Sequence, residues 1–171
     1  MAKPTPPAQT AESTRHYFEV IENFDTAMLV TRPSDGSLHG RPLSIAGKDP
    51  DGTLWFVTSA QSPKVAEIEA DPRALVTMQS SNRFVTLKGT AEVMKDRSKV
   101  EELWSAAQRI WFEGKDDPDI ALVRFVPSDA EYWDNAGAQG IRFAVAAAKA
   151  VIQGKPLTDR GDPKAHGKVG L

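Results

Sequence analysis

The 171-residue sequence contains no cysteine. This absence excludes disulfide bonds, thiolate metal centres, iron–sulfur clusters and a cysteine nucleophile. The sequence also lacks the run of about 18 apolar residues that a membrane span requires, so we expect no membrane partner. Its Pro- and Ala-rich start has no apolar segment of the kind found in secretory signals. We therefore expect a cytoplasmic protein.

Several signatures of catalytic and nucleotide-binding sites are missing as well. No Gly-x-Gly, Gly-Lys-Ser/Thr or Gly-x-Ser-x-Gly sequence occurs, which excludes a dinucleotide fingerprint, a P-loop and a hydrolase nucleophile elbow. The three histidines, His16, His39 and His166, lie far apart, and the acidic run 116–119 lacks the Gly and Glu of a calcium loop. We expect no metal site and assign no catalytic residue.

Charge of one sign is also scarce, because 21 basic residues face 23 acidic ones and the formal net charge is −2. This balance gives no reason to expect a nucleic-acid partner. The distribution is uneven, since residues 149–171 carry five basic and two acidic side chains, a net +3.

The length fits one domain, and the hydrophobic patterning predicts a mainly β (α+β) fold. Strands are predicted over Thr26–Thr31, Leu38–Ala46, Thr53–Thr58, Ala74–Gln79, Arg83–Val93 and Ile120–Val126. Helices are predicted over Thr10–Phe24, from the N-cap Ser62 to Ala70, over Arg97–Phe112, and over the alanine-rich Phe143–Val151. Because most connections are short, we expect an antiparallel barrel of six strands with peripheral helices. Residues 154–171 are predicted to be ordered only if they dock.

One cluster has the residue types of a phosphate site. The strand ending in Thr58 and Ser59 leads directly to Ser62 and Lys64, where a helix is predicted to begin. Hydroxyl groups, first-turn amides, the helix dipole and a lysine can together hold an anion. A capped helix with an exposed lysine is the alternative interpretation, and it is common.

A second candidate is Arg41, followed by Pro42, on the second predicted strand. An arginine fork suits phosphate oxygens, and the proline interrupts the strand ladder next to it. A surface arginine beside an edge-strand proline is the alternative.

Six motifs, taken in their order along the chain, resemble those of a known protein family. In sequence they are R-P-L, W-F-V-T, S-P-K, L-K-G-T-A-E-V, W-F-E-G-K-D-D-P-D-I-A-L-V-R-F-V-P and A-E-Y-W-D. Over Thr14–Asn135 the chain resembles the pyridoxamine 5′-phosphate oxidase-like FMN-binding split-barrel proteins, and within them the general stress protein 26 group. The implied division is a disordered head (1–13), an FMN-binding split barrel (14–135), and an alanine-rich helix with a basic tail (136–171).

The resemblance implies a six-stranded split barrel and a homodimer with FMN in a cleft at the interface. Arg41, Ser62 and Lys64 would hold the phosphate. The ribityl chain and ring would lie along Pro42, Leu43, Val57 and Thr58. By the same resemblance Phe84 would contact the ring, and Trp111 with Phe112 would close the site from the partner subunit. For these last two aromatics, packing in a helix core is the alternative.

The resemblance implies a flavin-dependent oxidoreductase acting on an unknown small molecule. A non-enzymatic flavin carrier or sensor is the alternative, and a barrel that has lost FMN or holds haem or a deazaflavin is a third. The departures argue against vitamin B6 oxidation, because Pro63-Lys64 replaces two adjacent basic residues and the C-terminal Arg–His signature is absent.

Overall fold

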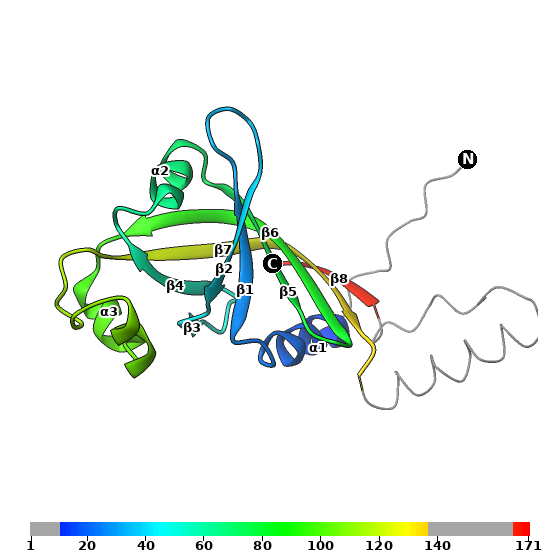
Figure 1. Ribbon diagram of the computed structural model, residues 1–171. Helices are drawn as coiled ribbons and strands as arrows, with labels where there is room; N and C mark the ends of the chain where they lie inside the picture. Colours follow the sequence, from blue (N-terminus) through cyan, green and yellow to red (C-terminus); the bar gives the residue numbers. More distant parts are fainter. Residues whose placement is uncertain (1–10, 137–165) are drawn as a thin grey trace, which may run out of the picture.

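A curled antiparallel sheet forms the body of the protein (Figure 1). The computed structural model describes residues 11–136 and 166–171. Within them the strand order is β2-β1-β5-β6-β7-β4-β3, and β8 pairs with β7 outside this path. The strands are β1 (Thr26–Thr31), β2 (His39–Ser44), β3 (Gly47–Lys48), β4 (Leu54–Ser59), β5 (Arg73–Gln79), β6 (Arg83–Met94), β7 (Ile120–Asp134) and β8 (His166–Gly170). The helices are α1 (Ala11–Ile21), α2 (Pro63–Ala70), α3 (Arg97–Leu103) and the 3-10 helix η1 (Ala106–Ile110).

A bulge between Lys88 and Gly89 shifts the register of β6 against β7. A Cβ at position 89 would lie 2.1 Å from the backbone oxygen of Val126, so only glycine fits there. The concave side holds the main core, which includes the fully buried Tyr17, Phe56, Leu87, Phe125 and Tyr132. The fold is thus a split β-barrel with peripheral helices, as predicted from the sequence.

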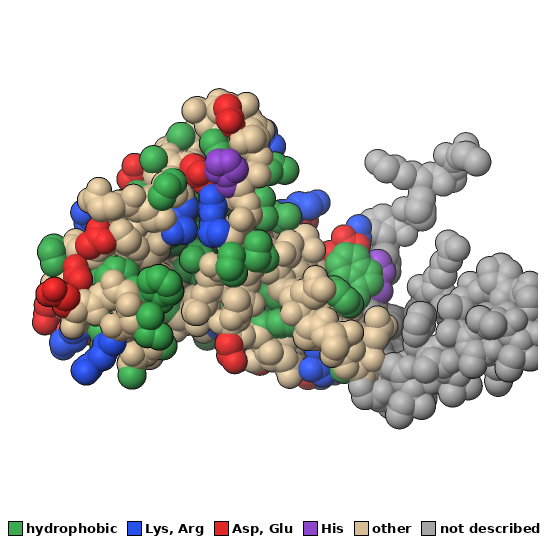
Figure 2. Space-filling model, in the orientation of Figure 1, with side chains coloured by type: hydrophobic (Ala, Val, Ile, Leu, Met, Phe, Trp, Pro, Cys, Tyr) green, Lys and Arg blue, Asp and Glu red, His purple; other side chains and the backbone are tan. Residues whose placement is uncertain are grey.

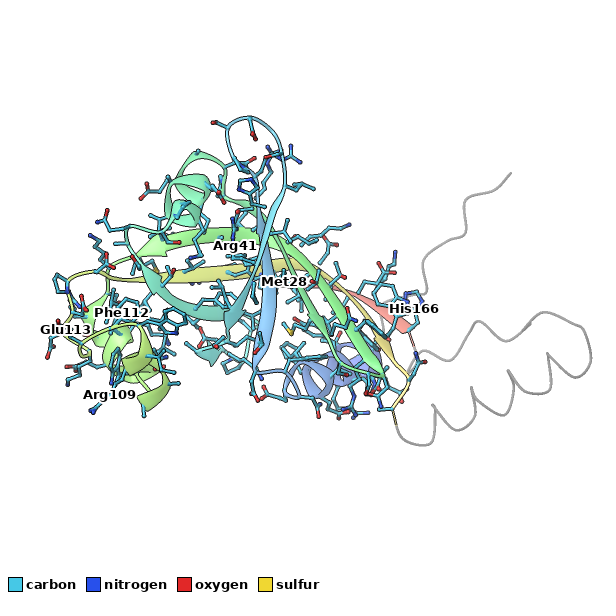
Figure 3. All side chains as sticks on the ribbon, viewed as in Figure 1. Met28, Arg41, Arg109, Phe112, Glu113 and His166 are labelled. Carbon is cyan, nitrogen blue, oxygen red and sulfur yellow. The ribbon has the colours of Figure 1, made fainter. Side chains whose placement is uncertain are left out.

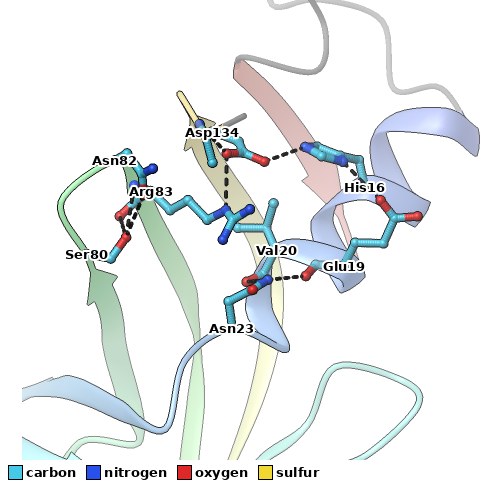
Figure 4. A network of polar contacts seen from close by, with 9 residues as sticks. His16, Glu19, Val20, Asn23, Ser80, Asn82, Arg83 and Asp134 are labelled. Carbon is cyan, nitrogen blue, oxygen red and sulfur yellow. Dashed lines mark hydrogen bonds and ion pairs between the residues drawn. The ribbon is translucent and has the colours of Figure 1, made fainter. Parts of the chain in front are cut away.

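Helix α1 closes one end of the barrel through a buried carboxylate (Figure 4). Asp134, at the end of β7, is 7% exposed. Its two oxygens accept hydrogen bonds from His16 Nε2 at 3.0 Å and from Arg83 Nε at 3.2 Å. A buried carboxylate needs such partners, so this network fixes α1 to the ends of β6 and β7.

The helix predicted over Arg97–Phe112 is wrong as a single element. Helix α3 ends at Leu103, Trp104 is extended (φ −67°, ψ 128°), and η1 follows after Ser105. The N–H and the hydroxyl of Ser105 both donate to Gln108 Oε1 at 2.6 Å. This local bonding starts a new turn, since serine competes with the helix backbone and favours helix starts.

The sheet has eight strands in the described residues, two more than the six predicted, and β7 is longer than expected. The strand predicted over Ile120–Val126 continues to Asp134, because Pro127 lies opposite the bulge at Gly89, where it interrupts little of the ladder. The extra strands are the two-residue β3 and the C-terminal β8.

The end of the predicted tail is docked on the sheet. Strand β8 pairs with β7 from Trp133↔His166 to Asp129↔Gly170, and Val169 is 2% exposed in the main core. Gly167 packs against Tyr132 so closely that a Cβ would lie 2.5 Å from its ring. The predicted head and the predicted helix Phe143–Val151 fall largely or wholly outside the described residues. In the described ranges, no helix has the length and apolarity that crossing a membrane requires.

Candidate functional site

One pocket in the described residues lies between β2, the end of β4, the start of α2 and η1. It has a volume of about 410 Å³. Its walls are Pro42, Leu43, Ser44, Val57, Thr58, Ser59, Ser62, Lys64, Ala107, Gln108, Trp111 and Phe112. Eight of the ten residues predicted to contact the cofactor, all but Arg41 and Phe84, therefore line one cavity.

The polar end of the pocket is built where β4 leads into α2. Pro63 opens the helix and Ser62 takes the extended N-cap conformation (φ −69°, ψ 136°), as the sequence predicts. The Ser62 hydroxyl, however, caps no helix amide. It accepts a hydrogen bond from Lys64 Nζ, which also donates to Thr58 Oγ1 at 2.8 Å. The lysine is partly buried against these hydroxyls, so it does not match the alternative of an exposed lysine.

Lys64 sits in an environment that disfavours its charge. Partial burial lowers the pKa of its ammonium group, nearby Arg41 lowers it further, and Glu67 acts in the opposite direction. Two cations placed together at a partly buried position repel each other, and a bound anion would relieve that repulsion. Basic side chains also gather beside a histidine on the visible face of the molecule (Figure 2).

Arg41 lies beside the pocket, between β2 and α2 (Figure 3). Its side chain is 21% exposed, and its guanidinium donates to Glu67 Oε2 at 2.6 Å and to the hydroxyl of Thr31. It is therefore not the loose surface arginine of the alternative interpretation. Its partner Glu67 lies three residues after Lys64 on α2, so both cations lie beside this helix, and the charge of Arg41 lowers the pKa of Lys64. We call Arg41, Ser62 and Lys64 the cationic corner.

Glu67 is the partner of Arg41 that the sequence analysis missed. Burial raises the pKa of its carboxyl, but hydrogen bonds from Thr31, His39 and Arg41 outweigh burial and lower the pKa to about 2. The carboxylate is therefore ionised at neutral pH. Its position three residues after Lys64 on a predicted helix was a usable signal, because residues at that spacing share a helix face.

The opposite wall of the pocket is apolar and aromatic. Leu43 and Val57 contribute from the sheet, and Trp111 and Phe112 from the end of η1. Phe112 is 7% exposed and packs in a second, smaller core, which matches the alternative of a core aromatic. Trp111 is 80% exposed, so packing in a core does not describe it. Ser59, one of the hydroxyl residues of the predicted phosphate cluster, also lines the pocket. Ser44, Ala107 and Gln108 line it as well and were not predicted.

Phe84 does not reach this pocket within one chain. It lies near the start of β6 and pairs with Trp133, near the C-terminal end of β7. The pocket residue Thr58 pairs with Ala121, at the opposite end of β7. The Phe84 ring is 36% exposed. The sequence order of strands cannot place a residue along a twisted sheet, so its role as a ring contact stays a prediction.

The chemistry of the pocket follows from this list of side chains. Among the described lining residues, Lys64 is the only one that titrates. A phosphorylated ligand with a flat apolar body fits such a cavity, because cations and hydroxyls gather at one end and apolar surface covers the other. The walls offer binding and orientation, and no described side chain there is an evident general acid other than the lysine.

Taken together, the fold and the pocket define a split-barrel protein with a cationic corner. The family model described as "Pyridoxamine 5′-phosphate oxidase like" matches residues 12–158. The chain therefore belongs to the pyridoxamine 5′-phosphate oxidase-like family.

Several proteins similar to this chain are described as general stress proteins. General stress protein 26 of Bacillus subtilis (strain 168) is 28% identical over 125 residues, which cover 70% of this chain and 86% of that protein. A structure from Jannaschia sp. CCS1, assigned to general stress protein 26, is 27% identical with a TM-score of 0.73 and covers 95% of this chain and 100% of its own. The general stress FMN/FAD binding protein of Xanthomonas citri is 27% identical with a TM-score of 0.64, covering 75% of this chain and 93% of its own.

Proposed function

We propose that the pocket binds FMN and that the protein is a flavin-dependent oxidoreductase acting on an unknown small molecule. The observation that supports it best is the cationic corner: Lys64 is held against the Ser62 and Thr58 hydroxyls at the polar end of an aromatic pocket, where burial and the Arg41 guanidinium lower its pKa. A phosphate monoester would balance the positive charge that Lys64 and Arg41 bring to this corner. The description of the Xanthomonas citri relative as FMN/FAD binding supports a flavin.

Each group has a defined part in this proposal. Arg41, Ser62 and Lys64 bind the phosphate, while Pro42, Leu43, Val57 and Thr58 line the ribityl chain and the ring. Bound FMN would supply hydride or electron transfer, and the protein supplies position and electrostatics. Trp111 and Phe112 keep water from the apolar end. The Lys64 ammonium group donates hydrogen bonds to the hydroxyl groups of Ser62 and Thr58.

We also propose that the protein is a cytoplasmic homodimer with the flavin at the interface. Ile110 and Trp111, at the rim of the pocket, are 77% and 80% exposed. Adjacent large apolar side chains with such exposure are unusual on a monomer and common at interfaces. Phe84, which does not reach the pocket of its own chain, would approach a flavin from the partner.

A non-enzymatic flavin carrier or sensor is the second candidate. It is favoured by the scarcity of titratable groups among the described lining residues. The two candidates differ in turnover. An oxidoreductase should pass electrons repeatedly from NADH or NADPH through bound FMN to an acceptor, whereas a carrier should bind without turnover.

The first test is the visible spectrum of the purified protein, followed by titration with FMN and with riboflavin, which lacks the phosphate. We expect a yellow protein that prefers FMN. Because each charge-assisted hydrogen bond contributes about 1.5–3 kcal/mol, Arg41→Ala and Lys64→Ala should each weaken FMN about tenfold or more. Riboflavin affinity should change little.

Lys168→Ala is the matched control, because this lysine lies on β8 and pairs with Glu131 instead of lining the pocket. It should leave both affinities unchanged. A colourless protein that binds neither ligand would exclude the proposed function. Equal losses of FMN and riboflavin in the Arg41 and Lys64 variants would exclude the phosphate assignment.

A further inference from the structure

The Glu67 carboxylate is held beside the cationic corner by three side chains from two strands. Its side chain is 10% exposed on α2. It accepts hydrogen bonds from Thr31 on β1 at 2.5 Å, from His39 Nδ1 on β2 at 2.9 Å, and from Arg41 on β2 at 2.6 Å. A carboxylate so fully bonded is a fixed group, and its position is set before any ligand binds.

Arg41, Thr31 and Glu67 form a closed ring of hydrogen bonds. The Thr31 hydroxyl accepts from one guanidinium nitrogen and donates to Glu67, while the other terminal nitrogen donates to the same carboxylate oxygen. These bonds use two of the five N–H donors of an arginine, which leaves three for an anion. The ring also fixes a long side chain that otherwise samples many rotamers.

We propose that Glu67 is a positioning residue that acts through Arg41 and sets the affinity of the pocket for the phosphate group of its ligand. This inference rests on the proposed function and adds to it a residue outside the pocket walls. Without Glu67, Arg41 would lose its orientation and would have to be ordered when the phosphate binds, which costs affinity.

The direct electrostatic effect of Glu67 has the opposite sign. A carboxylate near a phosphate repels it, but here the charge is compensated by the adjacent guanidinium. Once Arg41 is removed, the compensation is lost and only the repulsion remains. The loss of FMN affinity on removing Glu67 should therefore disappear or reverse when Arg41 is absent.

A double-mutant cycle on the full-length protein tests this inference, with FMN and riboflavin dissociation constants measured by flavin fluorescence. In the wild-type background, Glu67→Ala should weaken FMN about tenfold, the loss of one charge-assisted bond, and leave riboflavin within about twofold. In the Arg41→Ala background, the same substitution should leave FMN affinity unchanged or raise it.

Two further variants complete the design. Glu67→Gln keeps an acceptor for Arg41 and should recover part of the lost FMN affinity; it also serves if Glu67→Ala fails to fold. Glu69→Ala removes an exposed carboxylate from the same helix and should change neither affinity. Thermal unfolding of each variant separates loss of binding from loss of fold.

Three results would overturn the inference. Tighter FMN binding by Glu67→Ala in the presence of Arg41 would mean that repulsion dominates. Equal losses with and without Arg41 would mean that Glu67 acts independently of it, and equal losses for FMN and riboflavin would mean a general structural role. A wild-type protein that binds no flavin would instead remove the proposed function itself, so the two failures are distinguishable.

Discussion

At the scale of single residues, the site depends on how three charged groups share one corner. Burial and the nearby Arg41 guanidinium lower the pKa of Lys64, and the Glu67 carboxylate acts in the opposite direction. None of these effects is visible in the net charge of −2. The local arrangement, and not the total, determines which ligand the protein can hold.

The ionisation of Glu67 gives a prediction on acid stability. Its pKa is about 2 in the folded protein against an ordinary 4.5, so its stabilisation is complete above pH 4.5 and is lost as the pH falls through 2. Glu67→Gln should lower the free energy of unfolding at pH 7 by on the order of 2 kcal/mol. Below pH 2 the carboxyl is protonated in both states, and the two proteins should become equally stable.

Urea unfolding at a series of pH values measures this difference. Glu69→Gln, at an exposed position on the same helix, should show no such convergence with pH. A constant difference between Glu67→Gln and the wild type from pH 7 to pH 2 would contradict the assigned ionisation.

At the scale of elements, strand β8 is part of the core. Val169 is 2% exposed against β7, and Gly167 lies against the ring of Tyr132. Val169→Ala should lower the free energy of unfolding by about 1–3 kcal/mol, because it removes buried methyl groups and leaves a cavity. Lys168→Ala, on the other face of the same strand, is the control and should cost less than about 0.5 kcal/mol.

Thermal or urea unfolding monitored by circular dichroism tests the prediction. Equal stability of Val169→Ala and the wild type would mean that β8 does not pack on the sheet in solution.

Local sequence predicted most of the elements, and the reasons for the errors are specific. The strand over Thr26–Thr31 is confirmed residue by residue, because its apolar and β-branched residues form an uninterrupted run that ends at a turn signal. Strand β8 could not be predicted, since His-Gly-Lys-Val-Gly has a weak strand pattern and forms one only by pairing with β7. The break at Trp104 was also missed, because Ser105 and Gln108 bond locally in a way that helix periodicity ignores.

The candidate site was predictable to a similar extent. Hydroxyls and a cation at a strand-to-helix junction indicated the polar end of the pocket, and Ser62 and Lys64 line it. Glu67 was missed because a carboxylate at an anion site contradicts simple charge matching. Its role depends on Thr31, His39 and Arg41, which only the pairing of β1 with β2 brings to α2.

At the scale of the whole molecule, the proposed dimer links assembly to binding. If the partner completes the site, dilution that dissociates the dimer should also release flavin. Sedimentation should give a mass of about 37 kDa, twice the 18.6 kDa of one chain. Ile110→Asp, at an exposed rim position, should shift the protein toward the monomer and weaken FMN in parallel, because a buried charge opposes association.

Sedimentation velocity and FMN titration over the same concentrations measure both quantities. A monomer that binds FMN as tightly as the wild type would show that one chain holds a complete site.

The pairing of β4 with β7 has a consequence for the time course of folding. Ser59 pairs with Ile120, so β4, which contributes Val57, Thr58 and Ser59 to the pocket, is fixed only by pairing with β7, about 60 residues later in the chain. Such non-local pairings form slowly, because a long loop must close first. A ligand therefore meets its site only in a nearly complete barrel. It can slow the opening of the finished protein, but it can do little to guide the chain on its way there.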